Sequence, residues 1–243
     1  LAYMLTQAAM DGEARSVFKR LIKDYQGSKY IPDAYLAFAE YFFGKGDFDS
    51  ALDFYNKVLE FKNSGVYGYA KYKTAWVYYN LGDQEKALGS LIDVVQEMKD
   101  KPKSKTLVRA ARKDVVRVYA EIGQADKAYQ LFKKVGGDQS LEMMAQLGDL
   151  YMGNGKFNDA IKVYHELMKI DSKNKELCNW QFVVFRAQFA LPGDTKRVDE
   201  LENLVRVYKA AEGKKIELPK AQLEECHDNA MNTASELARL WHT

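Results

Sequence analysis

Residues 32–62 read PDAYLAFAEYFFGKGDFDSALDFYNKVLEFK, and this stretch decides the fold. Its first half carries large apolar residues at Tyr35, Phe38 and Phe42, which is the spacing of one face of an α-helix. A Gly-Asp pair at 46–47 follows, where glycine allows a positive φ and the aspartate can cap a second helix. The stretch therefore predicts two amphipathic helices joined by a tight turn.

The same pattern recurs along the chain. In each copy, a small anchor residue in the second helix is followed four positions later by a larger residue. Successive anchors lie 32 to 41 residues apart, which scatters around the roughly 34-residue period of helix-turn-helix repeats. The pairs are Ala14–Phe18, Ala51–Tyr55, Ala87–Leu91, Ala128–Phe132, Ala160–Tyr164 and, in a weaker form, Val198–Glu202.

Turn residues recur in phase with these anchors. A glycine lies five positions before five of the anchors, and glycine there allows a positive φ just past the end of the first helix. We expect aspartates 47, 83 and 194 to cap the second helices, whereas Gln124 and Lys156 cap less well. The glycines are Gly46, Gly82, Gly123, Gly155 and Gly193.

With these features the sequence resembles the tetratricopeptide repeat family. Residues 141–172 match best, and their matching positions are Leu147, Gly148, Tyr151, Gly155, Phe157, Ala160, Tyr164 and Leu167. The resemblance implies an all-α, right-handed superhelical solenoid of antiparallel helix pairs, with five to six repeats in one domain over residues 1–243. The repeats are expected at 1–30 (partial), 32–63, 68–99, 109–136, 141–172 and, weakly, 179–207.

The C-terminal segment 219–241 reads as one long helix without a clear partner. Its apolar residues Leu237, Leu240 and Trp241 suggest that further repeats, a partner or a second copy of the chain covers this end. The chain also begins at Leu1 without a methionine, so we expect a fragment of a longer protein.

Composition excludes several classes of protein. The apolar fraction of 47% and charged fraction of 29% are ordinary for a folded chain. The net charge of +2 gives no argument for nucleic acid, and no apolar run is long enough to span a bilayer. Cys178 and Cys226 lie on apolar helical patterns, and we expect two buried free thiols rather than a bridge.

No pattern of catalytic residues is present. The three histidines, His165, His227 and His242, have no metal-ligand partner at helical spacing. Gly153-Asn154-Gly155 lacks the Gly-Lys-Ser/Thr of a phosphate loop. We therefore expect no enzyme, no cofactor and no bound metal.

The family resemblance implies a concave groove lined by the first helix of each repeat. Transferred by position, the lining residues are Asp33, Leu36, Glu40, Phe43, Tyr69, Tyr72, Lys73, Trp76, Tyr79, Lys113, Arg117, Glu142, Gln146, Asp149, Trp180 and Val184. The carboxylate clamp of chaperone-binding members needs Lys and Asn where this chain has Leu36, Glu40 and Ala110, which argues against a chaperone adaptor.

An aromatic stripe with a basic edge is the candidate site for a protein or peptide partner. Four aromatic residues lie on one helical face, and aromatic side chains bury much area at low entropic cost. Nearby cations can meet carboxylates. The alternative is that the stripe packs against the next repeat. The candidate residues are Tyr69, Tyr72, Lys73, Trp76, Tyr79, Lys113 and Arg117.

The most basic region is the loop at 99–105 with the following helix face at Arg109, Arg112, Lys113 and Arg117. Nucleic acid or anionic lipid is one interpretation. A solvated loop is the interpretation we favour, because no aromatic residue is interleaved with the lysines.

The junction at residues 18–34 is similar to repeat junctions of bacterial periplasmic members of the family. That resemblance implies a scaffold in a bacterial cell envelope that binds a peptide or a partner domain. Two alternatives stay open: a structural segment of a longer solenoid, and a cytoplasmic adaptor.

Overall fold

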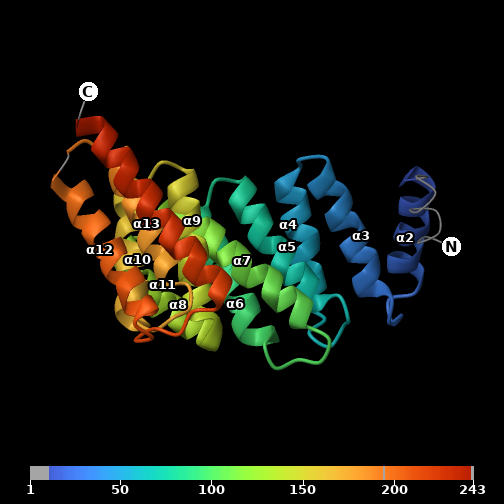
Figure 1. Cartoon of the computed structure of the whole chain (residues 1–243). Helices are drawn as coiled ribbons and strands as arrows, with labels where there is room; N and C mark the ends of the chain where they lie inside the picture. The colour runs from blue at the N-terminus through green and yellow to red at the C-terminus, as the bar shows by residue number, and fades with distance from the viewer. Residues whose placement is uncertain (1–10, 194, 242–243) are drawn as a thin grey trace. The chain divides into compact units, whose positions relative to one another are not determined.

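The computed structural model of the protein describes residues 11–193 and 195–241. Within these residues the secondary structure is helical, without strands. The chain divides between Val118 and Tyr119, inside helix α7, into two compact units. In Figure 1 consecutive helices alternate in direction along the chain. The all-α fold of paired helices is therefore confirmed, while the assignment of one domain to the whole chain stays a prediction.

The first unit contains the start of the repeat series. Its helices pack in sequence order, with α3 against α4, α4 against α5, and α5 against α6. The predicted repeats at 32–63 and 68–99 thus correspond to helix pairs. The helices are α2 (Asp11–Asp24), α3 (Ile31–Gly44), α4 (Phe48–Leu59), α5 (Tyr67–Asn80), α6 (Gln84–Met98) and the part of α7 (Lys105–Ile122) that precedes the unit boundary.

The second unit continues the series to the C-terminal helix. Here α8 packs on α9, α9 on α10, α10 on α11, and α11 on α12. The weakly predicted repeat at 179–207 therefore forms a helix pair, even though Glu202 is exposed. The helices are α8 (Ala128–Gly136), α9 (Ser140–Gly153), α10 (Phe157–Ile170), α11 (Leu177–Ala190), α12 (Thr195–Glu212) and α13 (Lys220–Trp241), with 3-10 turns η1 (Ala125–Lys127) and η2 (Gly137–Gln139).

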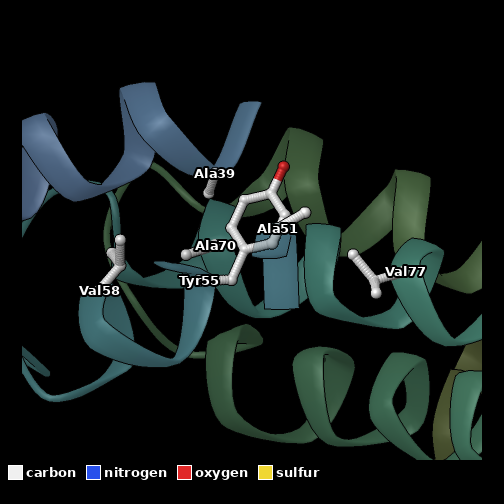
Figure 2. Packing of buried hydrophobic residues seen from close by; sticks show 6 residues of the cluster. All are labelled: Ala39, Ala51, Tyr55, Val58, Ala70 and Val77. Atoms are coloured by element: carbon white, nitrogen blue, oxygen red, sulfur yellow. The ribbon is translucent and has the colours of Figure 1, made fainter. Parts of the chain in front are cut away.

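Large and small side chains alternate in the core of each pair. Figure 2 shows the cluster between α3, α4 and α5, in which the ring of Tyr55 lies among small side chains. The small residues let the helix axes approach, and the ring fills the space between them. The buried members are Ala39, Ala51, Tyr55, Val58, Ala70 and Val77.

Most of the predicted turn glycines and both described aspartate caps are confirmed. Glycines 46, 82, 155 and 193 all have positive φ. Asp47 Oδ1 accepts from the Ser50 amide at 3.2 Å, and Asp83 Oδ1 accepts from the Lys86 amide at 3.1 Å. Residue 194 lies outside the described residues.

Gly123 departs from this pattern, because it does not adopt the positive φ that glycine allows there. A Cβ at Gly123 would lie 2.4 Å from the ring of Tyr119. Glycine is therefore required at this position for the close approach of an aromatic ring. The Tyr119 hydroxyl donates to the Gln124 carbonyl at 2.8 Å, which ties down the turn before η1.

Two expectations for the C-terminal segment were wrong. Cys178 and Cys226 form a disulfide, with 5.8 Å between their Cα atoms, a separation typical of bonded cysteines. The segment 219–241 also has a partner, because α13 packs on α12 and on α11 (Figure 1). Leu237 is buried, whereas the side chains of Leu240 and Trp241 lie outside those that the structure describes. The expectation that further repeats, a partner or a second copy covers this end stays a prediction.

Candidate partner-binding surface

The aromatic stripe lies on α5, whose opposite face is buried in the core. Tyr69 is 41% exposed, and Tyr72, Trp76 and Tyr79 are half-buried. The rings of Tyr72 and Trp76 meet edge-to-face with centroids 6.5 Å apart, and those of Trp76 and Tyr79 at 5.3 Å. Edge-to-face contact is a favoured geometry for aromatic pairs. The stripe is therefore an ordered set of rings that retains solvent-exposed area.

Tyr72 connects this stripe to α7. Its hydroxyl donates to Asp114 Oδ2 at 2.5 Å, and Asp114 is only 8% exposed. Burial, together with this carboxylate, raises the pKa of Tyr72 to about 12. Burial also raises the pKa of Asp114, although the bond to Tyr72 and the charges of Arg117 and Lys113 oppose that rise. Tyr72 is therefore committed to an internal hydrogen bond.

Lys73 connects the stripe to α3 instead. Its Nζ lies 3.5 Å from Glu40 Oε2 and 3.7 Å from the centroid of the Phe43 ring. A cation over an aromatic face is attracted by the ring quadrupole. Glu40 also accepts a hydrogen bond from the hydroxyl of the buried Tyr55. Lys73 is thus held by the neighbouring repeat and is less available to a partner than the sequence suggested.

Lys113 and Arg117 remain open to solvent. Both are exposed and lie one helical turn apart on α7, on either side of Asp114. Since Asp114 is bonded to Tyr72, the two cations flank the aromatic stripe. The name α5–α7 surface is used below for Tyr69, Tyr72, Trp76, Tyr79, Lys113 and Arg117.

One position of the repeat binds an internal tyrosine in two repeats and carries a different kind of residue in others. In two repeats an acidic residue lies fifteen positions before the tyrosine that follows the anchor, and it accepts that tyrosine's hydrogen bond. The pairs are Tyr55 with Glu40, and Tyr164 with Asp149 Oδ1 at 2.6 Å. The repeats at 68–99 and 109–136 have Leu91 and Phe132 in place of the tyrosine. These side chains carry no hydroxyl, so a residue at the acidic position has no such bond to accept.

Trp76 and Arg117 occupy that acidic position in these two repeats. In the two repeats with the internal hydrogen bond the position carries a carboxylate, whereas Trp76 and Arg117 are residue types common at binding hot spots. In the repeat at 179–207 the same position is the buried Ala187. The spacing of fifteen residues between this position and the tyrosine after the anchor could have been found in the sequence. Asp114 could be found as a lone carboxylate on the apolar face of its helix, but its bond to Tyr72 could not.

The remaining predicted lining residues divide between the surface and the core. Asp33 and Glu142 are exposed, whereas Leu36 is half-buried. Gln146 Nε2 donates to Glu142 Oε1 at 3.2 Å. Trp180 and Val184 are buried, at 5% and 0% exposure, so their assignment to a binding surface was wrong. Both faces of α11 are covered, because α10 packs against it on one side and α12 on another.

The basic loop at 99–105 is a turn before α7. A pocket of about 420 Å³ is lined there by residues 99–103, 105 and 106. Lys101 Nζ lies 3.8 Å from Glu97 Oε1 and 5.2 Å from the Tyr67 ring centroid. The charge of Lys101 is therefore engaged by Glu97 and Tyr67 of the same chain.

The described residues contain neither a metal-binding cluster nor a membrane-spanning helix. Residues 11–193 and 195–241 contain no cluster of three or more His, Cys, Asp or Glu side chains suited to a metal ion. Across the same part of the chain, no helix has the length and apolar character needed to cross a membrane.

Comparison with protein families identifies the repeats. Models of the tetratricopeptide repeat match residues 12–66, 69–97 and 141–174. These matches fall on helix pairs that the structure shows and that share the same anchor pattern. The chain belongs to the tetratricopeptide repeat family. Proteins of this family bind protein or peptide partners and are generally non-enzymatic scaffolds. No curated protein sequence matches the chain.

Solved structures agree with the fold. A tetratricopeptide repeat protein from Parabacteroides merdae is similar with a TM-score of 0.51 at 14% identity, covering 100% of this chain and 96% of that one. MamA is similar with a TM-score of 0.44 at 19% identity, covering 79% and 98%. The TPR2AB domain of yeast Sti1, in a complex with pHSP90, gives 0.39 at 16% identity, covering 88% and 98%. The first of these likenesses supports the repeat fold.

Proposed function

We propose that this chain is a non-enzymatic scaffold that binds a peptide segment or a partner domain on the α5–α7 surface. The observation that carries the proposal is the identity of Trp76 and Arg117 at a position that binds an internal tyrosine in other repeats. Neither residue is needed for that internal bond. The side chain of Trp76 also takes part in the hydrogen bonding of Tyr72 and Asp114. Its half-buried ring and the exposed Arg117 are nevertheless suited to contact with another molecule.

The chemistry of the surface indicates the partner. Lys113 and Arg117 are exposed cations on one helix, and the nearby carboxylate of Asp114 is buried and bonded to Tyr72. A partner carboxylate can accept hydrogen bonds from these cations, while an adjacent apolar side chain packs on Tyr69 and Trp76. We therefore propose a protein segment that carries an acidic residue next to an apolar one. Nucleic acid is not the proposed partner, because the aromatic and basic residues form one compact patch rather than a track along a strand.

A peptide selection tests this function. Peptides are selected from a random library on the native chain, and their dissociation constants are measured by calorimetry. Tyr69→Ala and Arg117→Ala should each raise the dissociation constants of the selected peptides at least tenfold. The first change removes an anchor ring, and the second removes a charge-assisted hydrogen bond. Tyr72→Ala is a poor test, since it would leave the buried Asp114 without its hydroxyl partner.

The matched control is the double variant Lys133→Ala, Lys134→Ala, which removes two exposed cations from α8. The control should bind the peptides as the native chain does. Selected peptides that lack acidic residues, or that bind the Arg117→Ala chain unchanged, would contradict the proposed surface.

We further propose that the scaffold works in a bacterial cell envelope, with a cytoplasmic adaptor as the alternative. The junction at residues 18–34 supports this location through its similarity to periplasmic repeat junctions. The disulfide adds support, since such bonds persist mainly in oxidising compartments. Fractionation of the native cells, followed by immunoblotting, should place the protein in the envelope fraction, and recovery in the cytoplasm would contradict this location.

A further inference from the structure

The disulfide between Cys178 and Cys226 joins the first helix of the last repeat to the C-terminal helix. Cys178 lies in the first turn of α11, and Cys226 lies in the second turn of α13. The two residues are 48 positions apart, so the closed loop contains all of α12. Both are almost fully buried. The bond therefore fixes α13 to a helix that is remote in sequence.

As far as Arg239, the last residue of α13 whose side chain the structure describes, the inner face of this helix buries few large apolar side chains, although Leu223 is half-buried. Its fully buried residues follow the helical spacing, and most are small or polar: Cys226, Ala230, Thr233 and Leu237. Met231, a larger apolar residue of this helix, is 56% exposed. Hydrophobic stabilisation scales with the apolar area removed from water. Packing alone therefore holds α13 more weakly than a helix with large buried side chains.

Helix α10 in the same unit provides the contrast. Its inner face buries Val163, Tyr164 and Leu167, each at 2% exposure or less. The Tyr164 hydroxyl adds a hydrogen bond to Asp149 Oδ1 on α9. Helix α10 is thus held by side chains of full size, with no covalent bond to its neighbours among the described residues.

The contact between α13 and the start of α11 is polar around the disulfide. A pocket of about 260 Å³ is bordered by both cysteines and otherwise by charged and amide side chains. Gln222 Nε2 donates to Glu176 Oε1 at 3.2 Å across this contact. A polar pocket excludes little water, so it adds little to the stability of the contact.

We propose that the disulfide is what holds α13 on the last helix pair, so that the C-terminal unit is completed only by thiol oxidation. The two thiols are oxidised to one disulfide, and their two electrons and two protons pass to a disulfide-bonded oxidant, which becomes a dithiol. Reduction by a dithiol reverses the step. The reduced chain keeps α11 paired with α12 but releases α13, which uncovers Leu204 and the half-buried Val207 and Tyr208.

Thiol counting is the first arm of the test. The native chain, isolated under non-reducing conditions and then denatured, should not react with maleimide. After reduction each chain should react with two equivalents of maleimide. Two reactive thiols before reduction would show that the bond does not form, and would overturn the proposal.

Hydrogen exchange is the second arm. Backbone amides of α13 should exchange at least tenfold faster when the native chain is reduced with dithiothreitol, while amides of α4 and α6 in the other unit stay unchanged. The Cys178→Ser, Cys226→Ser double variant should exchange like the reduced chain and should not respond to dithiothreitol. Unchanged protection of α13 in the reduced native chain would overturn the proposal, and this measurement does not depend on whether the variant folds.

Discussion

Two clusters of the molecule solve the same packing problem in different ways. Between α3, α4 and α5, Tyr55 is fully buried (Figure 2). The rings of Phe42 and Phe54 stack beside this cluster with centroids 5.5 Å apart. Between α11, α12 and α13, the fully buried members are Leu204, Ala230 and the two bonded cysteines. Aromatic rings lie only at the margin of this second cluster.

This difference indicates which interactions keep the helices of a repeat packed together. An internal repeat has large side chains on both helices, so burial of apolar area and dispersion contacts suffice. Most of the fully buried side chains described on α13 are small or polar, and a covalent bond compensates by restricting the unfolded chain. The predictions below remove one element of this comparison at a time.

The largest effect is expected from Tyr55→Ala in the first cluster. Removal of a buried aromatic side chain should lower the free energy of unfolding by about 4 kcal/mol. It also deprives Glu40 of the tyrosine hydroxyl. Urea denaturation followed by circular dichroism measures this change. The loss should be the same with and without reductant, and a reductant-dependent loss would contradict a cluster held by packing alone.

Removal of the disulfide should have the next largest effect. A closed loop of 48 residues stabilises a folded chain by about 4 kcal/mol, because cross-linking lowers the entropy of the unfolded state. Tyr55→Ala ranks above it because that change also removes the hydroxyl bound to Glu40. The Cys178→Ser, Cys226→Ser variant should therefore unfold at lower urea concentration than the oxidised native chain. The reduced native chain is the control and should match the variant to within the error of the measurement.

Gly148→Ala tests whether tight packing also governs the second unit. A Cβ at this position would lie 2.6 Å from the buried ring of Tyr164, and overpacking of this kind costs about 2 kcal/mol. Thermal unfolding should show the loss. Gly153→Ala at the end of the same helix, where a Cβ meets no atom within 4 Å, is the matched control.

The smallest effect concerns the ion pair between Lys71 on α5 and Glu97 on α6. The hydrogen bond from Lys71 holds the pKa of Glu97 below its usual range, although burial opposes this. Because the folded-state pKa is the lower one, the pair stabilises the fold above the unfolded-state pKa, and this stability is lost as the pH falls through the folded-state pKa. Melting temperatures from pH 6 to pH 3 should fall less for Glu97→Gln than for the native chain. If the melting temperatures of the two chains fell equally with pH, the contribution of this ion pair to stability would be contradicted.

Most of the fold could be predicted because its signals are local. The anchor pairs, the glycine turns and the aspartate caps each depend on residues within one helix or one turn, and the structure confirms them at 46–55 and at 82–91. The candidate surface was predicted in part, since the face of α5 follows from helical spacing. The engagement of Tyr72 by Asp114 was not predicted, because 42 positions separate the two residues.

The sequence by itself determined the repeat period, the helix pairs and the family, since these follow from side-chain spacing and local backbone preference. Only the tertiary structure decided which faces are covered. It buried Trp180 and Val184, and it paired Cys178 with Cys226. The physical reason is that burial and disulfide pairing depend on which remote helix packs alongside, and the local spacing of a single helix carries no information about its neighbour.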